Sequence, residues 1–430
     1  MKKIYYITAV FATLFLVGCG DGIDLPGVNV ETDLNKIPLP DNNVNLEQVE
    51  LKPSTEPMLH EGLHTEEDFQ RIRDKKAAGE EPWVSAYQLL VESQFSQKTA
   101  DTYPTEWIKR GISGDENYMN AARGATIAYQ QALRWKIEQD DEYAAKAVEN
   151  LNKWVQTCVG VTGNTNLSLA AGLYGYEFAI AGELLRDYGG WDRADFAAFQ
   201  NWLLKVFYPA NDDFLKRHHD TNALHYWANW CLCNIAAKMA IGIVTDRRDI
   251  YNEGIGHLQT GDTNGRLRRA IYHDYAPDYN FAQWQESGRD QGHTLMCVGL
   301  MGVICQLAWS QGDDFFAYDD NLFMRACEYA ACCNYTNETV PYTTYIWQKQ
   351  SQWGYPIPEQ TALGGGKWIK RAIWALPYYH YKGVKDISDD NLKYTKIATE
   401  YVGIEGGGGY YDANSGGYDV LGLGTLMYAR

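Results

Sequence analysis

The sequence lacks the short motifs of several large enzyme classes. It has no P-loop, no dinucleotide-binding fingerprint, no nucleophile elbow and no HExxH zinc motif. These absences argue against nucleotide-dependent enzymes, dehydrogenases, α/β-hydrolases and zinc peptidases. No single pair of carboxylates dominates the sequence either. This weakens the case for a glycoside hydrolase, which needs two opposed carboxylates.

The sequence is also poor in positive charge. Its 38 Lys and Arg residues are outnumbered by 55 Asp and Glu residues, and the formal net charge is −17. Nucleic acid is therefore not an expected partner, because phosphate binding needs a basic face. An acidic protein can still bind a polyanion where basic residues converge locally. Three clusters could do so, although solvated helix faces are the alternative for each: 216–219, 266–269 and 367–371.

Nine cysteines are present, but no spacing among them matches a zinc site. Eight lie mostly in apolar helical stretches, where a free cysteine behaves as a small hydrophobe. We therefore predict no metal site and no cofactor, and leave disulfides open. These eight are Cys158, Cys231, Cys233, Cys297, Cys305, Cys327, Cys332 and Cys333.

The ninth cysteine lies in an N-terminal segment that carries the clearest targeting signal in the sequence. Two lysines precede an apolar run over residues 4–17, which is too short to span a bilayer, and Cys19 follows. The pattern predicts a signal peptide over 1–18 with a lipobox, after which Cys19 is acylated. Residues 19–57 are rich in Asp, Asn, Pro and Glu and predict a flexible tether. We expect a Gram-negative outer-membrane lipoprotein, periplasmic or at the cell surface, held to the membrane only by its lipid.

Helical periodicity dominates the rest of the chain, with almost no alternating strand pattern. The ordered domain is expected over 58–430, with a capping box at Thr65–Asp68. Short connections make successive helices antiparallel neighbours. So many hairpins in one domain must stack or close into a ring, and a ring places the loops of one end around a central cleft. The expected helices cover roughly 83–97, 117–138, 142–158, 168–187, 192–207, 221–243, 247–259, 288–310, 319–333, 366–382 and 417–429.

Aromatic residues are abundant, with 31 Tyr and 14 Trp. Such a surplus is typical of sugar-binding platforms, because a flat ring covers apolar area while its polar tip forms hydrogen bonds. A large helical core that uses aromatics is the alternative. Two long loops, 270–286 and 334–365, concentrate Tyr, Trp, Gln and Pro, and long loops in a compact domain are more often functional than idle.

Three segments carry residue types suited to chemistry. In the first, 217–230, Asn222 and His225 are three apart and are expected on one face at the start of a helix. In the second, 283–293, Glu286, Arg289 and His293 follow helical spacing and are expected to share a face. A polar helix start capped by Ser287 is the alternative there. The third is the loop 341–345, which leads to Trp347.

The same segments resemble a known family. TNALHYWANW (221–230), QWQESGRDQGHT (283–294) and VPYTTY (340–345) are similar to the alginate-lyase superfamily, and most similar to polysaccharide lyase family 38, whose members act on alginate or glucuronan. The resemblance covers about residues 60–430. It implies an all-α (α/α) toroid, expected as (α/α)7, and β-elimination of 1,4-linked uronate polymers. The Asn-Asn-His run of alginate lyase family 5 is absent, and only Asn222 and His225 stand near it.

β-Elimination explains why these residue types are needed. The C5 proton of a uronate becomes acidic only when the carboxylate is neutralised, and one well-placed donor is worth about 3–4 kcal/mol. In mannuronate the proton and the leaving oxygen lie on one side, so one tyrosine can serve both. We expect Tyr342 in that role, with Arg289 lowering its pKa, and His225 as the base for guluronate.

The remaining expected residues complete the site. Asn222 and His293 join the catalytic group. The expected substrate-binding residues are Arg217, His219, Tyr226, Trp227, Gln283, Trp284, Glu286, Tyr345 and Trp347. The expected partner is an anionic polysaccharide, mannuronate-rich alginate first, bound by a monomer. Three alternatives stay open: a glucuronan lyase of the same fold, a lipid-anchored glycan-binding protein without catalysis, and a helical-toroid glycoside hydrolase.

Overall fold

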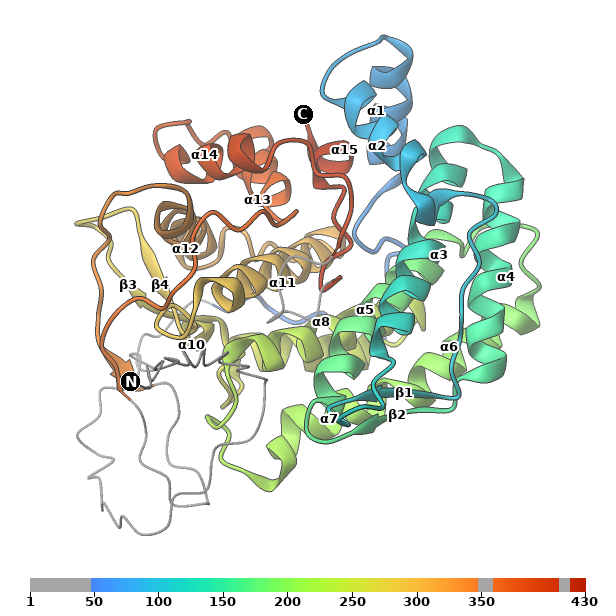
Figure 1. Ribbon diagram of the computed structural model, residues 1–430, viewed down its shortest axis with the longest axis horizontal. Coiled ribbons are helices and arrows are strands. Elements are labelled where there is room, and N and C mark those ends of the chain that lie inside the picture. Colours follow the sequence, from blue (N-terminus) through green and yellow to red (C-terminus); the bar gives the residue numbers. More distant parts are fainter. Residues whose placement is uncertain (1–47, 347–358, 410–417) are drawn as a thin grey trace, which may run out of the picture.

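The protein is seen in a computed structural model that describes residues 48–346, 359–409 and 418–430, so Cys19 and Trp347 lie outside the described residues. Helices dominate it (Figure 1). They are α1 (Glu66–Ala77), α2 (Trp83–Glu92), α3 (Tyr118–Glu138), α4 (Asp141–Thr157), α5 (Leu167–Leu184), α6 (Arg193–Val206), α7 (Tyr208–Arg217), α8 (Ala228–Val244), α9 (Arg248–Thr260), α10 (Leu267–Ala270), α11 (Gln291–Ser310), α12 (Tyr318–Tyr335), α13 (Ala375–Tyr379), α14 (Lys393–Val402) and α15 (Gly424–Tyr428).

Strands are short and pair only two by two among the described residues. β1 (Trp107–Arg110) runs parallel to β2 (Gly160–Gly163). β3 (Ile271–Asp274) and β4 (Ala282–Trp284) are antiparallel, as are β5 (Tyr345–Ile346) and β6 (Glu359–Gln360). These ladders tie loops together at the ends of helices, and the expected all-α class is confirmed.

Three helices are buried on nearly every side and form an inner layer. α8 is buried at every residue, α5 at all but Leu167 and α11 at all but Trp309. Packing runs from α5 to α8 and from α8 to α11. A helix that meets no water on any side has no need of a polar face. α11 is accordingly long and apolar enough to cross a membrane, yet 94% of its apolar window is buried inside the protein.

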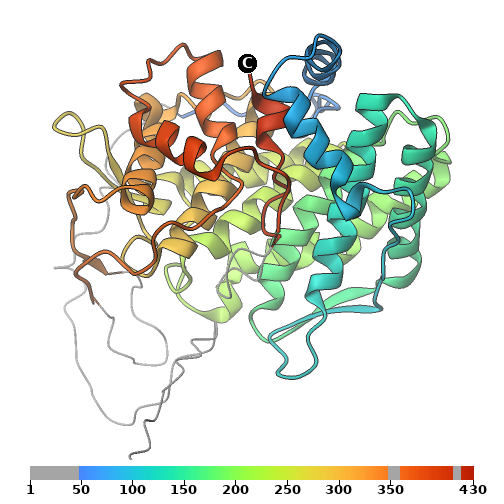
Figure 2. The ribbon, with the colours of Figure 1, turned by 45° about the horizontal axis from the view of Figure 1, so that its top comes forward.

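α4 and α9 are amphipathic instead, whereas α12 is buried throughout residues 322–335. α4 packs on α3, α9 on α8, and α12 on α11, which gives three packed helix pairs. The contacts also close on themselves, running from α3 through α5, α8, α11, α12, α14, α13, α15 and α1 back to α3. α1 and α2 therefore lie beside α15, where the two ends of the domain meet (Figure 2). The chain is an (α/α) toroid, as expected, and its count of seven hairpins stays a prediction.

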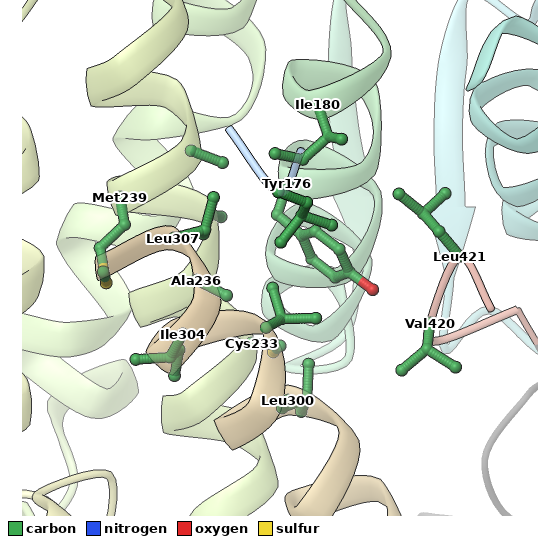
Figure 3. Close-up of a cluster of buried hydrophobic side chains, with 14 of the residues drawn as sticks. Tyr176, Ile180, Cys233, Ala236, Met239, Leu300, Ile304, Leu307, Val420 and Leu421 are labelled. Carbon is green, nitrogen blue, oxygen red and sulfur yellow. The ribbon is translucent and has the colours of Figure 1, made fainter. Parts of the chain in front are cut away.

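The middle of the ring is filled by side chains (Figure 3). Tyr176 of α5 lies among residues of α8, α11 and the C-terminal segment, and its hydroxyl donates to the Asp419 carbonyl at 2.7 Å. Cys233 of α8 is part of this cluster. All eight cysteines of the described chain are free and buried, so their expected role as small hydrophobes is confirmed. The labelled members are Tyr176, Ile180, Cys233, Ala236, Met239, Leu300, Ile304, Leu307, Val420 and Leu421.

Three expected helices are wrong in their bounds, and the one expected over 417–429 begins only at Gly424. The helix expected over 221–243 begins only at Ala228, because the Asn222 carbonyl and side chain bind the backbone of His225 and Leu224 in a local turn. The helix expected over 366–382 begins only at Ala375, after a glycine run. α7 and α14 were not expected. The capping box at Thr65–Asp68 is confirmed.

Packing begins before residue 58, where the domain was expected to start. The Val49 amide donates to Gln259 Oε1 of α9 at 2.7 Å. The buried guanidinium of Arg248 donates to the carbonyls of Glu56 at 2.8 Å and Pro57 at 2.7 Å. Residues 48–57 are therefore a strap across α9 and not part of a free tether.

We predict that a chain beginning at residue 48 is as stable as the full-length protein, whereas one beginning at residue 58 is destabilised. Removing the strap leaves Arg248 buried without these acceptors, a loss of about 1.5–3 kcal/mol for a charged donor. Thermal unfolding followed by circular dichroism should show a Tm lower by a few degrees, about 2–5 °C. Equal Tm values for the two chains would restore the boundary at residue 58.

Candidate functional site

The N-termini of α5, α8 and α11 lie at one end of the ring. The Asn234 amide of α8 donates to the Ser168 carbonyl in the first turn of α5, at 3.2 Å. Glu286, just before α11, accepts from the Asn229 amide in the first turn of α8, at 3.2 Å. Helix N-termini carry partial positive charge from their free N–H groups. This end of the ring therefore favours negatively charged groups.

Gln285 and Glu286 cap α8 from outside that helix. The helix has no side-chain cap of its own at Trp227. Instead Gln285 Oε1 accepts from the Ala228 amide at 2.9 Å, and Glu286 Oε1 accepts from the next amide. Neither residue was expected in this role, although a carboxylate at a helix N-terminus is a favourable placement. The segment that follows β4 is thus fixed to α8.

Asp290 caps α11 and also holds His293. Its Oδ1 accepts from the His293 amide at 2.8 Å, and its Oδ2 lies 2.6 Å from His293 Nδ1. Burial alone would raise the pKa of Asp290, but the hydrogen bond and charge of His293 outweigh it and the pKa is lowered. The cap is Asp290, and not Ser287 as the alternative interpretation had it. A carboxylate on Nδ1 fixes the tautomer and orientation of an imidazole.

Arg289 lies between Glu286 and Trp227. Its Nη1 is 3.3 Å from Glu286 Oε2, and its guanidinium carbon is 5.1 Å from the centre of the Trp227 ring. Burial raises the pKa of Glu286, and the charges of Arg289 and His293 offset part of that rise. The Arg289 side chain keeps 20% of its surface exposed, whereas that of Glu286 has none. Asp290, whose side chain is 23% exposed, lies 3.8 Å from Arg289 Nε, so Arg289 and Asp290 are the two charged groups of this cluster that a ligand can reach.

The loop 341–345, which we call the tyrosine loop, contacts the turn over residues 285–290. The Tyr345 hydroxyl accepts from the Gly288 amide at 3.0 Å and donates to the Gln285 carbonyl. The Tyr342 hydroxyl donates to the Gln360 carbonyl at 3.1 Å. A Cβ at Gly288 would lie 2.6 Å from the Tyr342 hydroxyl, so only glycine permits this approach. The structure thus brings both tyrosine hydroxyls to the backbone turn that precedes Arg289.

The expected lowering of the pKa of Tyr342 by Arg289 is wrong in this arrangement. Burial raises the pKa of Tyr342, and the neighbouring Tyr275 and Tyr272 raise it further. The charge of Arg289 is directed at Glu286 instead. Burial likewise raises the pKa of Tyr345, which is more deeply enclosed. Both hydroxyls are therefore protonated at neutral pH, which suits a proton donor better than a base.

Residues 217–227 contribute an aromatic and imidazole cluster beside this turn. His225 lies edge-on to Tyr226, with ring centres 4.9 Å apart, and His219 lies 5.8 Å from the same ring. His219 Nε2 is also 3.0 Å from Ser168 Oγ. Burial lowers the pKa of His219. These three residues and Trp227 lie at the expected end of the ring.

Three residues of this segment do not lie as expected. Asn222 and His225 are not on a helix face, and the Asn222 side chain accepts from the Leu224 amide at 2.9 Å in an exposed turn. Arg217 is exposed, and its guanidinium bridges Asp213 at 2.8 Å and Asp220 at 2.7 Å. With two carboxylates already bound, Arg217 contributes little net positive charge for a ligand.

Gln283 and Trp284 are structural rather than ligand-binding. Both side chains are fully buried. The Gln283 amide pins the tyrosine loop, with Oε1 accepting from the Thr343 amide at 2.8 Å and Nε2 donating to the Thr343 carbonyl at 3.0 Å. The Trp284 indole donates to the Ala326 carbonyl at 2.9 Å. Their expected substrate contacts are therefore corrected to a supporting role.

Two positioning residues escaped sequence reasoning. Asp290 lies three residues before His293, the spacing of a helix cap, and this signal was available. Gln285 had no such signal, because it caps a helix that is distant in sequence. Among the residues that the structure describes, no three His, Cys, Asp or Glu side chains gather as a metal site would require.

The fold and this arrangement define a class: an (α/α)-toroid protein with Arg, His and Tyr gathered at the N-terminal ends of its inner helices. A family model described as alginate lyase matches residues 73–338. The chain therefore belongs to the alginate lyase family, and it is a polysaccharide lyase.

Solved structures agree on the fold. A variant of alginate lyase A1-III complexed with a tetrasaccharide matches with a TM-score of 0.57 and 13% identity, covering 86% of this chain and 95% of that one. An alginate lyase from Bacteroides ovatus matches with a TM-score of 0.52 and 13% identity, covering 79% and 94%. No match was found among curated proteins.

We predict that Asp290→Asn separates the two tasks of Asp290. Asparagine still caps α11, so the free energy of unfolding should change little, whereas Asp290→Ala should lose about 0.5–2 kcal/mol. Asparagine cannot hold His293 as a carboxylate does, so lyase activity, followed as absorbance near 235 nm, should fall at least about tenfold. A fully active, stable Asp290→Asn variant would reduce the Asp290–His293 pair to a helix cap.

Proposed function

We propose that this lyase cleaves 1,4-linked uronate polymers, with mannuronate-rich alginate as the preferred substrate, and releases 4,5-unsaturated oligosaccharides. The observation that carries the proposal is the partly exposed guanidinium of Arg289 at the N-terminal end of the inner helices. An anionic sugar is favoured there by the guanidinium and by the helix ends together. The tetrasaccharide bound by the A1-III variant supports a carbohydrate substrate for the same fold.

Arg289 neutralises the carboxylate of the bound uronate in this mechanism. Removal of the C5 proton leaves negative charge that spreads into this carboxylate, and one preorganised donor facing it is worth about 3–4 kcal/mol. Arg289 is preorganised by Glu286 on one side and the Trp227 ring on the other. The guanidinium therefore does not need to be ordered when the substrate binds.

Tyr342 gives its proton to the leaving 4-linked oxygen. Its raised pKa keeps the hydroxyl protonated, as a general acid requires. The C5 proton then needs another acceptor, and we assign it to His225, a half-buried imidazole two residues before Trp227. This division replaces the expectation that Tyr342 performs both transfers. The assignment also replaces the expectation that His225 is the base for guluronate, and with mannuronate it requires His225 and Tyr342 to approach the same face of the sugar.

Digestion of three polymers tests the substrate. Polymannuronate, polyguluronate and glucuronan are offered separately, and absorbance near 235 nm reports the new double bond. The proposal requires the absorbance to rise fastest with polymannuronate. Addition of EDTA should leave that rate unchanged. A faster rise with glucuronan identifies a glucuronan lyase of the same fold. Binding without absorbance would leave a glycan-binding protein, and reducing sugar without absorbance a hydrolase.

We predict that Tyr342→Phe lowers turnover by about 10²–10⁴-fold, as expected for lost acid catalysis, while Tm hardly changes because the ring remains. The matched control is Tyr345→Phe. It removes a hydroxyl that bridges Gly288 and Gln285, so it should lower the free energy of unfolding by about 1–3 kcal/mol. Its loss of activity should be smaller than that of Tyr342→Phe. If Tyr345→Phe alone loses activity, Tyr345 and not Tyr342 is the general acid. Two active variants would exclude this loop as the proton donor.

The pH profile gives the same assignment a second readout. A general acid works while protonated, and the pKa of Tyr342 is raised above the ordinary tyrosine value of about 10. The kcat/KM of the wild type should therefore stay level from neutral pH to above pH 10 and fall only beyond it, with circular dichroism confirming that the fold persists. A fall centred well below pH 10 would contradict Tyr342 as the acid.

We also propose that Cys19 carries a lipid that holds the enzyme at the outer membrane, on its periplasmic or outer face. The support is the apolar run over 4–17 with two preceding lysines. Labelled palmitate should enter the wild type but not Cys19→Ser, and equal labelling of both would contradict it.

A further inference from the structure

An exposed aromatic pair lies on the surface beside the site. Trp368 is 43% exposed and Tyr401 of α14 is 37% exposed, and their ring centres are 5.4 Å apart. Lys370 Nζ lies 5.5 Å from the centre of the Tyr401 ring. We call Trp368, Tyr401 and Lys370 the aromatic platform. An exposed apolar patch rimmed by polar residues is a common mark of a binding surface.

The aromatic platform is held rigidly from behind. The buried Tyr335 ring lies 5.2 Å from the Tyr401 ring, and its hydroxyl donates to the Ile369 carbonyl at 2.6 Å. The Tyr401 hydroxyl donates to the Trp368 carbonyl at 3.4 Å. Trp368 has a φ of +62°, a left-handed conformation that bulky residues rarely adopt. Such conformations persist where the surroundings enforce them, often at ligand-binding positions.

The aromatic platform is tied to the catalytic cluster by short connections. The Trp368 amide donates to the Asn334 carbonyl at 3.0 Å, and the Asn334 side chain donates to Gln291 Oε1 at the start of α11, also at 3.0 Å. Gly365 accepts from the Gln291 amide at 2.8 Å. Trp368 is three residues beyond Gly365, so their Cα atoms are at most roughly 11 Å apart. Both sites therefore face one end of the ring.

The charges here suit an anionic chain. Lys367 and Lys370 are exposed, and among the described residues neither is ion-paired with a carboxylate. Lys367 donates to the Thr336 carbonyl at 2.9 Å. Glu400 is the exposed carboxylate next to Tyr401 in sequence, and it leaves the two lysines in excess. A local cationic spot matters in a protein of net charge −17, because it offsets general repulsion of polyanions.

We propose that the aromatic platform is an outer subsite for the uronate polymer, distinct from the cluster around Arg289. A sugar ring of the chain packs on Trp368 and Tyr401, and its carboxylate faces Lys370. The inference rests on the proposed function and extends it, because an outer subsite favours long chains over short oligosaccharides. It holds the polymer without touching the bond that is cleaved.

Kinetics on long and short substrates test the proposal. Trp368→Ala and Lys370→Ala should each raise KM for polymannuronate about two- to fivefold, and together about tenfold, with kcat unchanged. The kcat/KM for a mannuronate tetrasaccharide should not change. Trp368→Phe and Lys370→Arg should restore most of the affinity. The matched control is Lys76→Ala, which removes a lysine 4.1 Å from the Tyr87 ring on a remote surface and should change nothing.

Affinity electrophoresis in gels that contain alginate separates failure of this proposal from failure of the proposed function. Reduced retardation of Trp368→Ala supports the outer subsite even if no polyuronate is cleaved. Unchanged KM and unchanged retardation in both variants would overturn it. Equal losses on polymer and tetrasaccharide would place the residues in the catalytic cluster instead. A change of oligomeric state in analytical ultracentrifugation would make the patch a subunit interface. Should Trp368→Ala fail to fold, the exposed Lys370→Ala still decides.

Discussion

The carboxylate of Glu286 has no solvent exposure, and a charge so placed is tolerated only while its partners are present. One oxygen accepts from the first turn of α8, and the other faces Arg289. Removing a partner from a buried ion pair typically costs about 3–5 kcal/mol. These contacts fix the 285–290 segment to α8. They therefore also fix the backbone that carries Arg289.

Three loops approach closely where Glu286 joins α8: the 285–290 turn, the tyrosine loop and the 359–371 segment. Gly288 admits the Tyr342 hydroxyl, and a Cβ at Gly364 would lie 2.4 Å from the Arg289 backbone. Side chains at these two glycines would push the tyrosine loop and the 359–371 segment away from the 285–290 turn. The backbone of Ser287 and Gln291 binds Gly364 and Gly365 directly, both at 2.8 Å. Tyr342, Arg289 and the 359–371 segment are thus held together by hydrogen bonds to the backbone.

Periodicity predicted the buried helices well because an inner helix shows its burial in an unbroken apolar run, as α8 and α11 do. It failed over 221–227 because local turns of Asn222 competed with the helix. Glu286, Arg289 and His293 lie close together, but not on one helix face as their spacing predicted, because Glu286 and Arg289 lie in a turn before α11 begins at Gln291. Arg217 was misjudged because its bonds to Asp213 and Asp220 depend on side-chain geometry that composition does not reveal. Trp284 looked like a sugar platform and is instead enclosed in the core.

The charge balance at the site explains why binding groups are needed beyond it. Arg289 shares its charge with Glu286, and Asp290 lies 2.6 Å from His293 Nδ1, so these carboxylates offset much of the positive charge of the cluster. At physiological salt, surface charges act over about 8 Å, so distant lysines cannot compensate. The helix ends supply partial positive charge at the cleavage point itself. A long polyanion therefore needs cations at short intervals along its path, and Lys367 and Lys370, which pair with no carboxylate among the described residues and lie next to exposed rings, meet that requirement.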